Sequence, residues 1–157
     1  MKISFQRILV LGFFLALVFL LVGKQTDKSV KEINKEESST QYIKISGTTI
    51  KTELALTLAE KEQGLSGRSM LAEDESMLFV FDQPGKYAFW MKDMNFAIDI
   101  IWLGEDLRIV YITKDARPES YPEIFSPEQD SKYVLEVVSG FSDKNNLKVG
   151  DKMEFTF

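Results

Sequence analysis

Residues 96–102, with the sequence Phe-Ala-Ile-Asp-Ile-Ile-Trp, indicate the class of fold. Hydrophobic side chains occupy both the odd and the even positions around Asp99, which is the pattern of a strand buried on both faces. A buried carboxyl group without a partner costs several kcal/mol or takes up a proton. We therefore expect Asp99 to pair with Arg68 or Lys92, to accept hydrogen bonds from backbone N–H groups, or to be kept for function.

Glu136 lies in a similar setting, within the apolar segment Tyr-Val-Leu-Glu-Val-Val at residues 133–138. If Glu136 and Asp99 converge in the fold, their carboxyl groups could form an acid/base pair or a site for a hard cation. The alternative is that Glu136 faces solvent on the outside of the domain or fastens a loop.

Short apolar segments separated by turn residues lie on both sides of these two strands. They predict further strands at residues 42–46, 48–56, 76–81, 87–91, 107–113 and 153–157. Thr57 and Glu60 form the pattern of a capping box, which predicts a short helix ending near Gly64, and residues 142–147 could form one helical turn. The expected fold class is mainly β (α+β): a small barrel-like or sandwich domain of seven to eight short strands with one or two short helices.

The N-terminus has the pattern of an export signal. Lys2 and Arg7 precede an apolar run that continues to about residue 23, which predicts a signal peptide or a signal-anchor helix over residues 1–23. Residues 24–40 are polar and charged, as in a linker, and residues 41–157 form the single domain. The positive-inside rule places that domain outside the cell membrane, behind one N-terminal pass, or secreted if the signal is cleaved.

The composition excludes several classes of function. The chain has no Cys and no His, so zinc sites on those residues, disulfides and His-based catalytic triads are impossible. Residues 41–157 hold 13 Lys/Arg against 20 Asp/Glu, a net charge of −7 that repels nucleic acid. We expect no cofactor and no metal, and any metal would have to be a hard cation held by oxygen atoms.

Residues 89–94, Phe-Trp-Met-Lys-Asp-Met, place aromatic, thioether and charged side chains side by side. Trp90 could serve as a stacking platform in a ligand pocket, with Lys92 at the rim. Arg68 follows a Gly-Leu-Ser-Gly segment and could bind a carboxylate or phosphate through two hydrogen bonds. The predicted ligand-binding residues are therefore Arg68, Trp90, Lys92 and Asp99. The alternatives are a core strand with a basic rim, and an Arg68 that serves only as the partner of Asp99.

Taken together, these segments resemble a known family. The resemblance covers about residues 42–157 and is carried by Thr57, Glu60, Gly64-Leu65, Arg68, Met77–Phe81, Phe89–Lys92, Asp99-Ile100, Leu135-Glu136, Gly140 and Gly150-Asp151. The chain is similar to the bacterial and archaeal family known as domain of unknown function 192, or DUF192. That resemblance implies a compact, β-rich, barrel-like fold, frequently behind a signal sequence or membrane anchor. It implies no established activity.

Three functions are compatible with these observations. The first is a non-enzymatic extracytoplasmic module that binds a small ligand, either a sugar or a carboxylated molecule. The second is a structural or assembly domain that binds a protein partner at the membrane. The third is a hydrolase or lyase that uses Asp99 and Glu136 as its acid and base, in which case the two carboxyl groups must flank one cleft.

Overall fold

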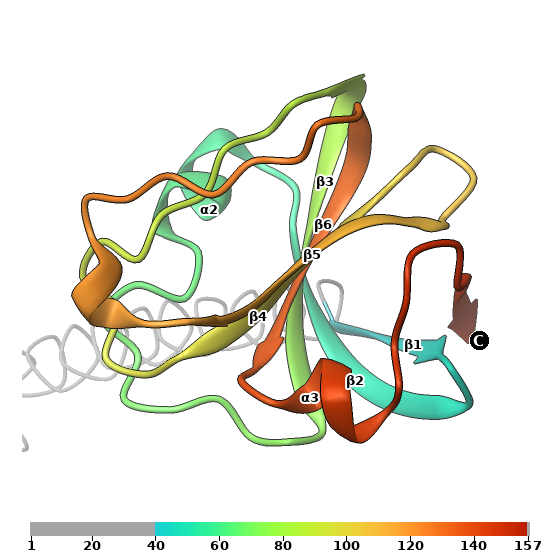
Figure 1. Ribbon diagram of the computed structural model, residues 1–157, viewed down its shortest axis with the longest axis horizontal. Coiled ribbons are helices and arrows are strands. Elements are labelled where there is room, and N and C mark those ends of the chain that lie inside the picture. The colour runs from blue at the N-terminus through green and yellow to red at the C-terminus, as the bar shows by residue number, and fades with distance from the viewer. Residues whose placement is uncertain (1–39, 157) are drawn as a thin grey trace, which may run out of the picture. The chain divides into compact units, whose positions relative to one another are not determined.

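The computed structural model describes residues 40–156. Within them, seven strands form one sheet in the order β5-β4-β6-β3-β2-β1-β7 (Figure 1). The strands are β1 (Thr40–Ile45), β2 (Thr48–Ala55), β3 (Glu75–Gly85), β4 (Ile98–Leu103), β5 (Ile109–Ala116), β6 (Ser131–Val138) and β7 (Met153–Thr156). Neighbouring strands are antiparallel except β2 and β3, which are parallel. The predicted mainly β fold is confirmed.

Two short helices and one 3-10 turn connect the strands. Helix α2 (Leu58–Gln63) follows β2, the 3-10 helix η1 (Pro118–Ser120) follows β5, and α3 (Phe141–Lys144) follows β6. Figure 1 shows α2 and α3 well apart, α2 towards the top left of the view and α3 at the bottom. The two predicted helices therefore exist, and each is short.

The sheet does not close into a complete barrel. Among residues 40–156, the edge strands β5 and β7 are not paired with each other as strands. They are joined instead by one bridge between Arg108 and Lys152, with backbone hydrogen bonds from Ile109 N to Asp151 O (2.9 Å) and from Met153 N to Leu107 O (2.9 Å). This junction joins the start of β5 to the turn that precedes β7. The expected barrel-like closure is therefore only partly realised.

One predicted strand is wrong. Residues 87–91 do not form a strand; Phe89 alone makes a bridge, with Phe125, through hydrogen bonds of 2.8 and 2.9 Å. The alternating aromatic side chains in this segment reflect which residues face the interior, and that pattern does not require an extended ladder of backbone hydrogen bonds. The segment instead lies alongside the sheet and forms part of a pocket wall.

The sheet is apolar on both faces. All six residues of β4 are buried, as predicted from residues 96–102. One face carries a cluster that includes Ile101 and Leu135, and the other carries a cluster that includes Trp102 and Val134. Because side chains alternate along a strand, adjacent residues of β4 and β6 contribute to different clusters. A buried carboxyl group on β4 or β6 therefore lies beside one cluster or the other, according to the face on which its residue projects.

The expected signal or anchor segment at residues 1–23 and the expected linker at residues 24–40 lie outside the described part of the chain, apart from Thr40 at the start of β1. Among residues 40–156, no helix is long and apolar enough to cross a bilayer.

Candidate functional site

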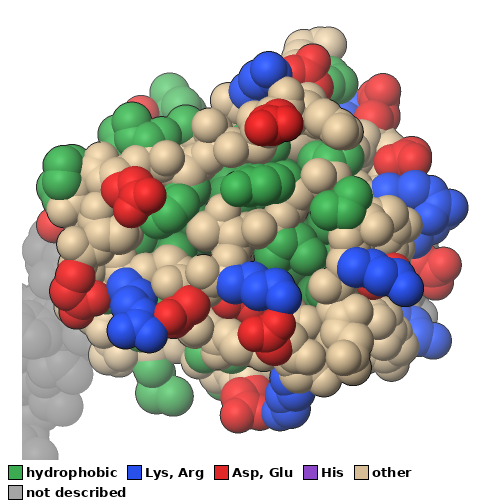
Figure 2. All heavy atoms as spheres, in the orientation of Figure 1, with side chains coloured by type: hydrophobic (Ala, Val, Ile, Leu, Met, Phe, Trp, Pro, Cys, Tyr) green, Lys and Arg blue, Asp and Glu red, His purple; other side chains and the backbone are tan. Residues whose placement is uncertain are grey.

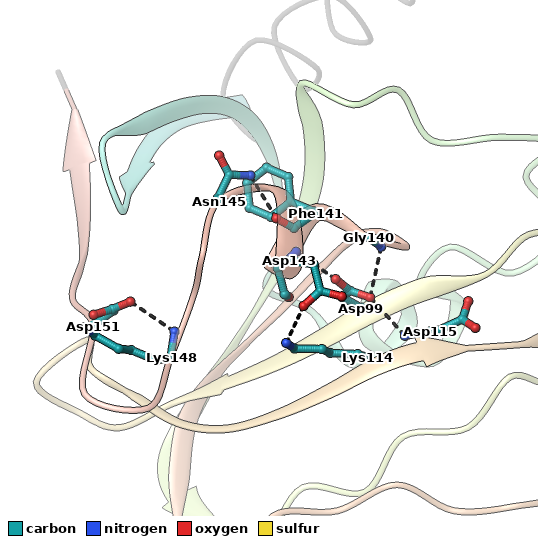
Figure 3. Close-up of polar contacts among 10 residues, drawn as sticks. Asp99, Lys114, Asp115, Gly140, Phe141, Asp143, Asn145, Lys148 and Asp151 are labelled. Atoms are coloured by element: carbon teal, nitrogen blue, oxygen red, sulfur yellow. Dashed lines mark hydrogen bonds and ion pairs between the residues drawn. The ribbon is translucent and has the colours of Figure 1, made fainter.

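Asp99 is completely buried, and its carboxyl group accepts hydrogen bonds from three backbone N–H groups. The donors are Asp115 (3.0 Å), Gly140 (3.3 Å) and Ser142 (2.8 Å). Figure 3 shows Asp99 between the backbone nitrogens of Gly140 and Asp115. Of the alternatives predicted for Asp99, hydrogen bonds from backbone N–H groups are confirmed, and the ion pair with Arg68 or Lys92 is wrong, because backbone donors take the place of a cation.

The local backbone explains why these three donors are free. Between Ile100 and Ile98 the register of β4 against β5 shifts, so that Asp115, with a φ of 52°, falls in an irregularity of the ladder. Gly140 and Ser142 lie at the N-terminus of α3, where the first N–H groups have no partner within the helix. No side chain at the cap position serves α3. Through these hydrogen bonds the side chain of Asp99 connects the start of α3 to the irregular end of β5.

Glu136 has a different environment. Its side chain is 5% exposed. Within residues 40–156, two buried side-chain oxygens have no hydrogen-bond partner: Oε2 of Glu136 and Oγ of Ser142. Burial raises the pKa of Glu136 to about 8, and the positive charge of Arg68 opposes that rise only in part. The carboxyl group of Glu136 is therefore largely protonated at neutral pH.

Arg68 forms an ion pair with Glu53. Its Nη2 lies 2.7 Å from Oε2 of Glu53. Glu53 on β2 is opposite Met77 on β3, and Met77 is opposite Glu136 on β6, so these three residues form a row on one face of the sheet. Arg68 is thus close enough to influence Glu136, while its guanidinium group is paired with Glu53.

Glu136 lines a pocket of about 240 Å³. One wall comes from the end of α2 and the turn after it, another from β3, and a third from the segment that follows β3. The full lining consists of Lys61, Glu62, Gln63, Gly64, Leu65, Ser66, Phe79, Phe81, Tyr87, Ala88, Phe89, Trp90, Met94 and Glu136. Figure 2 shows apolar side chains gathered in the middle of one face of the domain, with charged side chains around them.

The aromatic side chains of the pocket pack on one another. The rings of Phe81 and Tyr87 are stacked with centroids 3.4 Å apart, and those of Phe79 and Phe89 meet edge to face at 4.9 Å. Gly64 lies against this group, because a Cβ atom there would be 3.3 Å from the Phe79 ring at a φ of 51°. The pocket walls are therefore fixed by contacts among aromatic rings and by a close approach of the backbone.

Hydrogen bonds between loops fasten the rim. Oγ of Ser66 donates to the carbonyl oxygen of Lys92 (2.9 Å), and the Gly67 N–H donates to the carbonyl oxygen of Asp93 (2.8 Å). Nδ2 of Asn95 donates to the carbonyl oxygen of Arg68 (2.8 Å). The turn after α2 and the segment at residues 92–95 are thus tied together, and each contributes a lining residue, Ser66 and Met94.

The four predicted ligand-binding residues do not gather at one point. Trp90 lines the pocket and is 57% exposed. Lys92 is exposed, and neither it nor Arg68 is among the lining residues. Asp99 is buried on the other face of the sheet, where its oxygens are occupied by backbone donors. Only Trp90 among the four therefore borders this pocket.

The hypothesis of an Asp99–Glu136 acid/base pair is wrong. Asp99 is opposite Val137, whereas Glu136 is opposite Ile100. Residues that are opposite each other in an antiparallel pair project to the same face, and adjacent residues project to opposite faces. Asp99 and Glu136 therefore lie on opposite sides of the sheet and cannot flank a common cleft.

Several pocket residues were not identified as site residues from the sequence. Phe79 and Phe81 alternate along β3, a pattern that indicates one buried face and gives no sign of a cavity. Lys61 and Gln63 lie on α2, where they resemble ordinary exposed helix residues. The only signal in the sequence was the concentration of aromatic residues at positions 79–90.

Comparisons with known proteins place the chain in a family. The search of curated proteins found no match. A crystal structure of a proposed transcription regulator from Sinorhizobium meliloti 1021 is 30% identical, with a TM-score of 0.70, and the match covers 74% of this chain and 93% of that one. A protein of unknown function from Novosphingobium aromaticivorans DSM 12444 is 31% identical, also with a TM-score of 0.70, over 73% of this chain and 84% of that one. The model of the family described as DUF192, an uncharacterized ACR, matches residues 41–155, and the chain therefore belongs to the DUF192 family.

Proposed function

We propose that this domain binds a small molecule in the pocket that Glu136 and Trp90 line. The observation that carries the proposal is Oε2 of Glu136, a buried polar atom that has no hydrogen-bond partner within residues 40–156 and belongs to a side chain that borders the pocket. Buried polar atoms are nearly always hydrogen-bonded, so an exception at a pocket suggests that a ligand supplies the missing partner. The aromatic walls suit a ligand with an apolar face.

The size and chemistry of the pocket narrow the kind of ligand. A volume of about 240 Å³ is below the range of drug-sized pockets, about 300–1,000 Å³, and suits a small molecule such as a single ring. A sugar meets this description, because its C–H face can lie on Trp90 while a hydroxyl group bonds to Glu136. A carboxylated ligand has weaker support, since Arg68 is paired with Glu53 and the pocket already contains a carboxyl group.

The same pocket offers little support for catalysis. Glu136 is the only buried carboxyl group among its lining residues, and Glu62 at the rim is exposed. Acid/base chemistry by paired carboxyl groups needs two of them across one cleft. We therefore favour a binding function, displayed outside the membrane if residues 1–23 act as the expected signal or anchor.

A thermal-shift screen of the full chain in detergent tests the proposal, with monosaccharides, small alcohols and small amines as probes. A ligand at 100 times its dissociation constant should stabilise the domain by about 2.7 kcal/mol. Trp90→Ala and Glu136→Leu should both abolish that stabilisation. Tyr42→Ala is the matched control, because Tyr42 is similarly exposed (54%) and lies outside the pocket.

The possible outcomes of this screen have different meanings. Stabilisation that survives in Trp90→Ala and Glu136→Leu would show that the ligand binds elsewhere. Loss of stabilisation in Tyr42→Ala as well would point to a general loss of folding. Only a loss confined to the two pocket variants supports binding at this site.

A further inference from the structure

We infer that the ligand of this pocket is an organic cation, a small amine whose ammonium group pairs with Glu136 while its hydrocarbon part lies against the aromatic walls. This inference rests on the proposed function and specifies the class of ligand. The proposed function does not fix the charge of the ligand, and the contacts of the pocket favour a positive one.

Within residues 40–156, the acid in the pocket has no cation as an ion-pair partner. Its Oε2 has no hydrogen-bond partner there. Arg68 is the cation that opposes the rise in the pKa of Glu136, and its Nη2 lies 2.7 Å from Oε2 of Glu53. An ammonium group that enters the pocket would give Glu136 an ion pair that the described part of the chain does not supply, and a paired buried charge is tolerated where an isolated one is not.

The aromatic walls already hold a cation at the rim of the pocket. Nζ of Lys61 lies 5.0 Å from the centroid of the Phe81 ring. This distance is within the range of a cation–π contact, in which the negative face of an aromatic ring attracts a positive charge. Phe81 itself stacks on Tyr87, and Trp90 lines the same pocket. Aromatic faces around a buried acid are the arrangement that recognises ammonium ligands.

The net charge of the domain also favours a positively charged ligand. Residues 41–157 carry 13 Lys/Arg against 20 Asp/Glu, a net charge of −7. A domain with this charge attracts cations and repels anions over distances set by the ionic strength. Lys61 and Glu62 at the rim have opposite charges, so the rim itself does not reverse this preference.

Binding of a cation should be coupled to loss of a proton from Glu136, whose pKa burial raises to about 8. Below that pH the carboxyl group must ionise before it can pair with an ammonium group. The affinity should therefore rise about tenfold per pH unit up to about pH 8 and then level off. A neutral ligand that accepts a hydrogen bond from the protonated acid should instead weaken above pH 8.

Several other charged or ionisable groups surround Glu136. Arg68 and Glu53 form an ion pair on the same face of the sheet, and Lys61, Glu62 and Tyr87 line the pocket. Among these groups, Glu136 is the one whose pKa burial raises to about 8, so we assign the expected pH dependence to it.

Calorimetric titration of the full chain with three probes tests the inference: cyclohexylamine, cyclohexanol and glucose. Cyclohexylamine should bind about tenfold or more tightly than cyclohexanol at pH 8, and about tenfold more tightly at pH 7.5 than at pH 6.5. Glu136→Gln, which keeps the hydrogen-bonding group and removes the charge, should abolish both the preference and the pH dependence.

Two lysine variants provide a test that does not alter Glu136. Lys61→Gln removes the cation that lies over Phe81, so cyclohexylamine should bind severalfold more tightly. Lys86→Gln changes the net charge equally, and Lys86 is exposed and outside the pocket lining, so it should change the affinity much less.

The outcomes separate this inference from the function on which it rests. If cyclohexanol or glucose binds as tightly as cyclohexylamine, or if Glu136→Gln retains the amine preference, the inference is overturned. Neutral binding that Trp90→Ala abolishes would then still support the proposed function. If the folded chain binds none of the three probes at millimolar concentration, the inference is overturned and the proposed function loses its support.

Discussion

Asp99 and Glu136 lie on neighbouring strands of one sheet, both are buried, and their surroundings are opposite in kind. Asp99 accepts three hydrogen bonds from backbone N–H groups. Glu136 has an oxygen without a partner among the described residues and lies at a pocket lined by aromatic side chains. A buried acid that is fully hydrogen-bonded holds the fold together, whereas one left without partners is costly and is typical of a site.

The two carboxyl groups also lie in two different regions of the domain. On the Asp99 side, the start of α3 and the distorted end of β5 are joined through one carboxyl group (Figure 3). On the Glu136 side, none of the six residues of α2 is buried, and the helix lies beside the pocket with its capping box in place. The buried side chain of Asp99 thus holds the first region together through hydrogen bonds, whereas the second region contains a pocket that can accommodate a ligand.

The largest expected effect comes from breaking the Asp99 contacts. Asp99→Ala should reduce the free energy of unfolding by about 3–5 kcal/mol, because it removes the acceptor of one buried and two part-buried backbone N–H donors. Chemical denaturation of the full chain measures this change. Asp143→Asn is the control, since Asp143 is exposed and pairs with Lys114 at the surface, where an ion pair contributes little. Equal effects of the two variants would contradict the structural role of Asp99.

The second prediction concerns the pH dependence that Glu136 imposes. Because its pKa is raised from 4.5 to about 8, the folded domain holds a proton that the unfolded chain releases. The resulting stability is fully present below about pH 4.5 and is lost as the pH rises through about 8. Between pH 5 and 7, wild type should lose about 2–3 kcal/mol relative to Glu136→Gln. Parallel pH profiles for the two proteins would show that Glu136 titrates normally.

The smallest of these effects should come from α2. The Thr57 hydroxyl accepts a hydrogen bond from the Glu60 N–H (3.2 Å), and the Glu60 side chain accepts one from the Thr57 N–H (2.9 Å). Thr57→Ala should cost about 1 kcal/mol, and Thr57→Ser, which keeps the hydroxyl group, much less. Hydrogen exchange at residues 58–64 measures the loosening of this pocket wall. Unchanged protection in Thr57→Ala would mean that contacts other than the cap hold the helix.

Some features could be predicted because they depend on local sequence. The complete burial of β4 follows from apolar residues on both of its faces, and the helix after Thr57 follows from the capping box. The strand expected at residues 87–91 was wrong because alternating aromatic residues indicate which side faces inward, whether or not the backbone pairs with a neighbour. The pairing partner is distant in sequence, and the pattern contains no information about it.

The partners of the buried groups could be predicted only in kind. The sequence offered Arg68, Lys92 or backbone N–H groups as partners of Asp99; the backbone alternative is confirmed, and Arg68 pairs with Glu53. The donors to the Asp99 carboxyl group are backbone N–H groups from β5 and from the start of α3. Backbone N–H groups occur at every residue except proline, so only the folded geometry decides which of them are free to point at a carboxyl group.

The sequence by itself determined that the chain has a mainly β domain, that it has no cysteine or histidine chemistry, and that two carboxyl groups occupy apolar strands. Only the tertiary structure decided that these carboxyl groups differ. Asp99 is opposite Val137 and Glu136 is opposite Ile100, so a register fixed by strand pairing sends them to opposite faces. Because side chains alternate along a strand, a shift of β4 by one residue against β6 would have placed both carboxyl groups on the same face, and no local pattern of residues specifies that register alone.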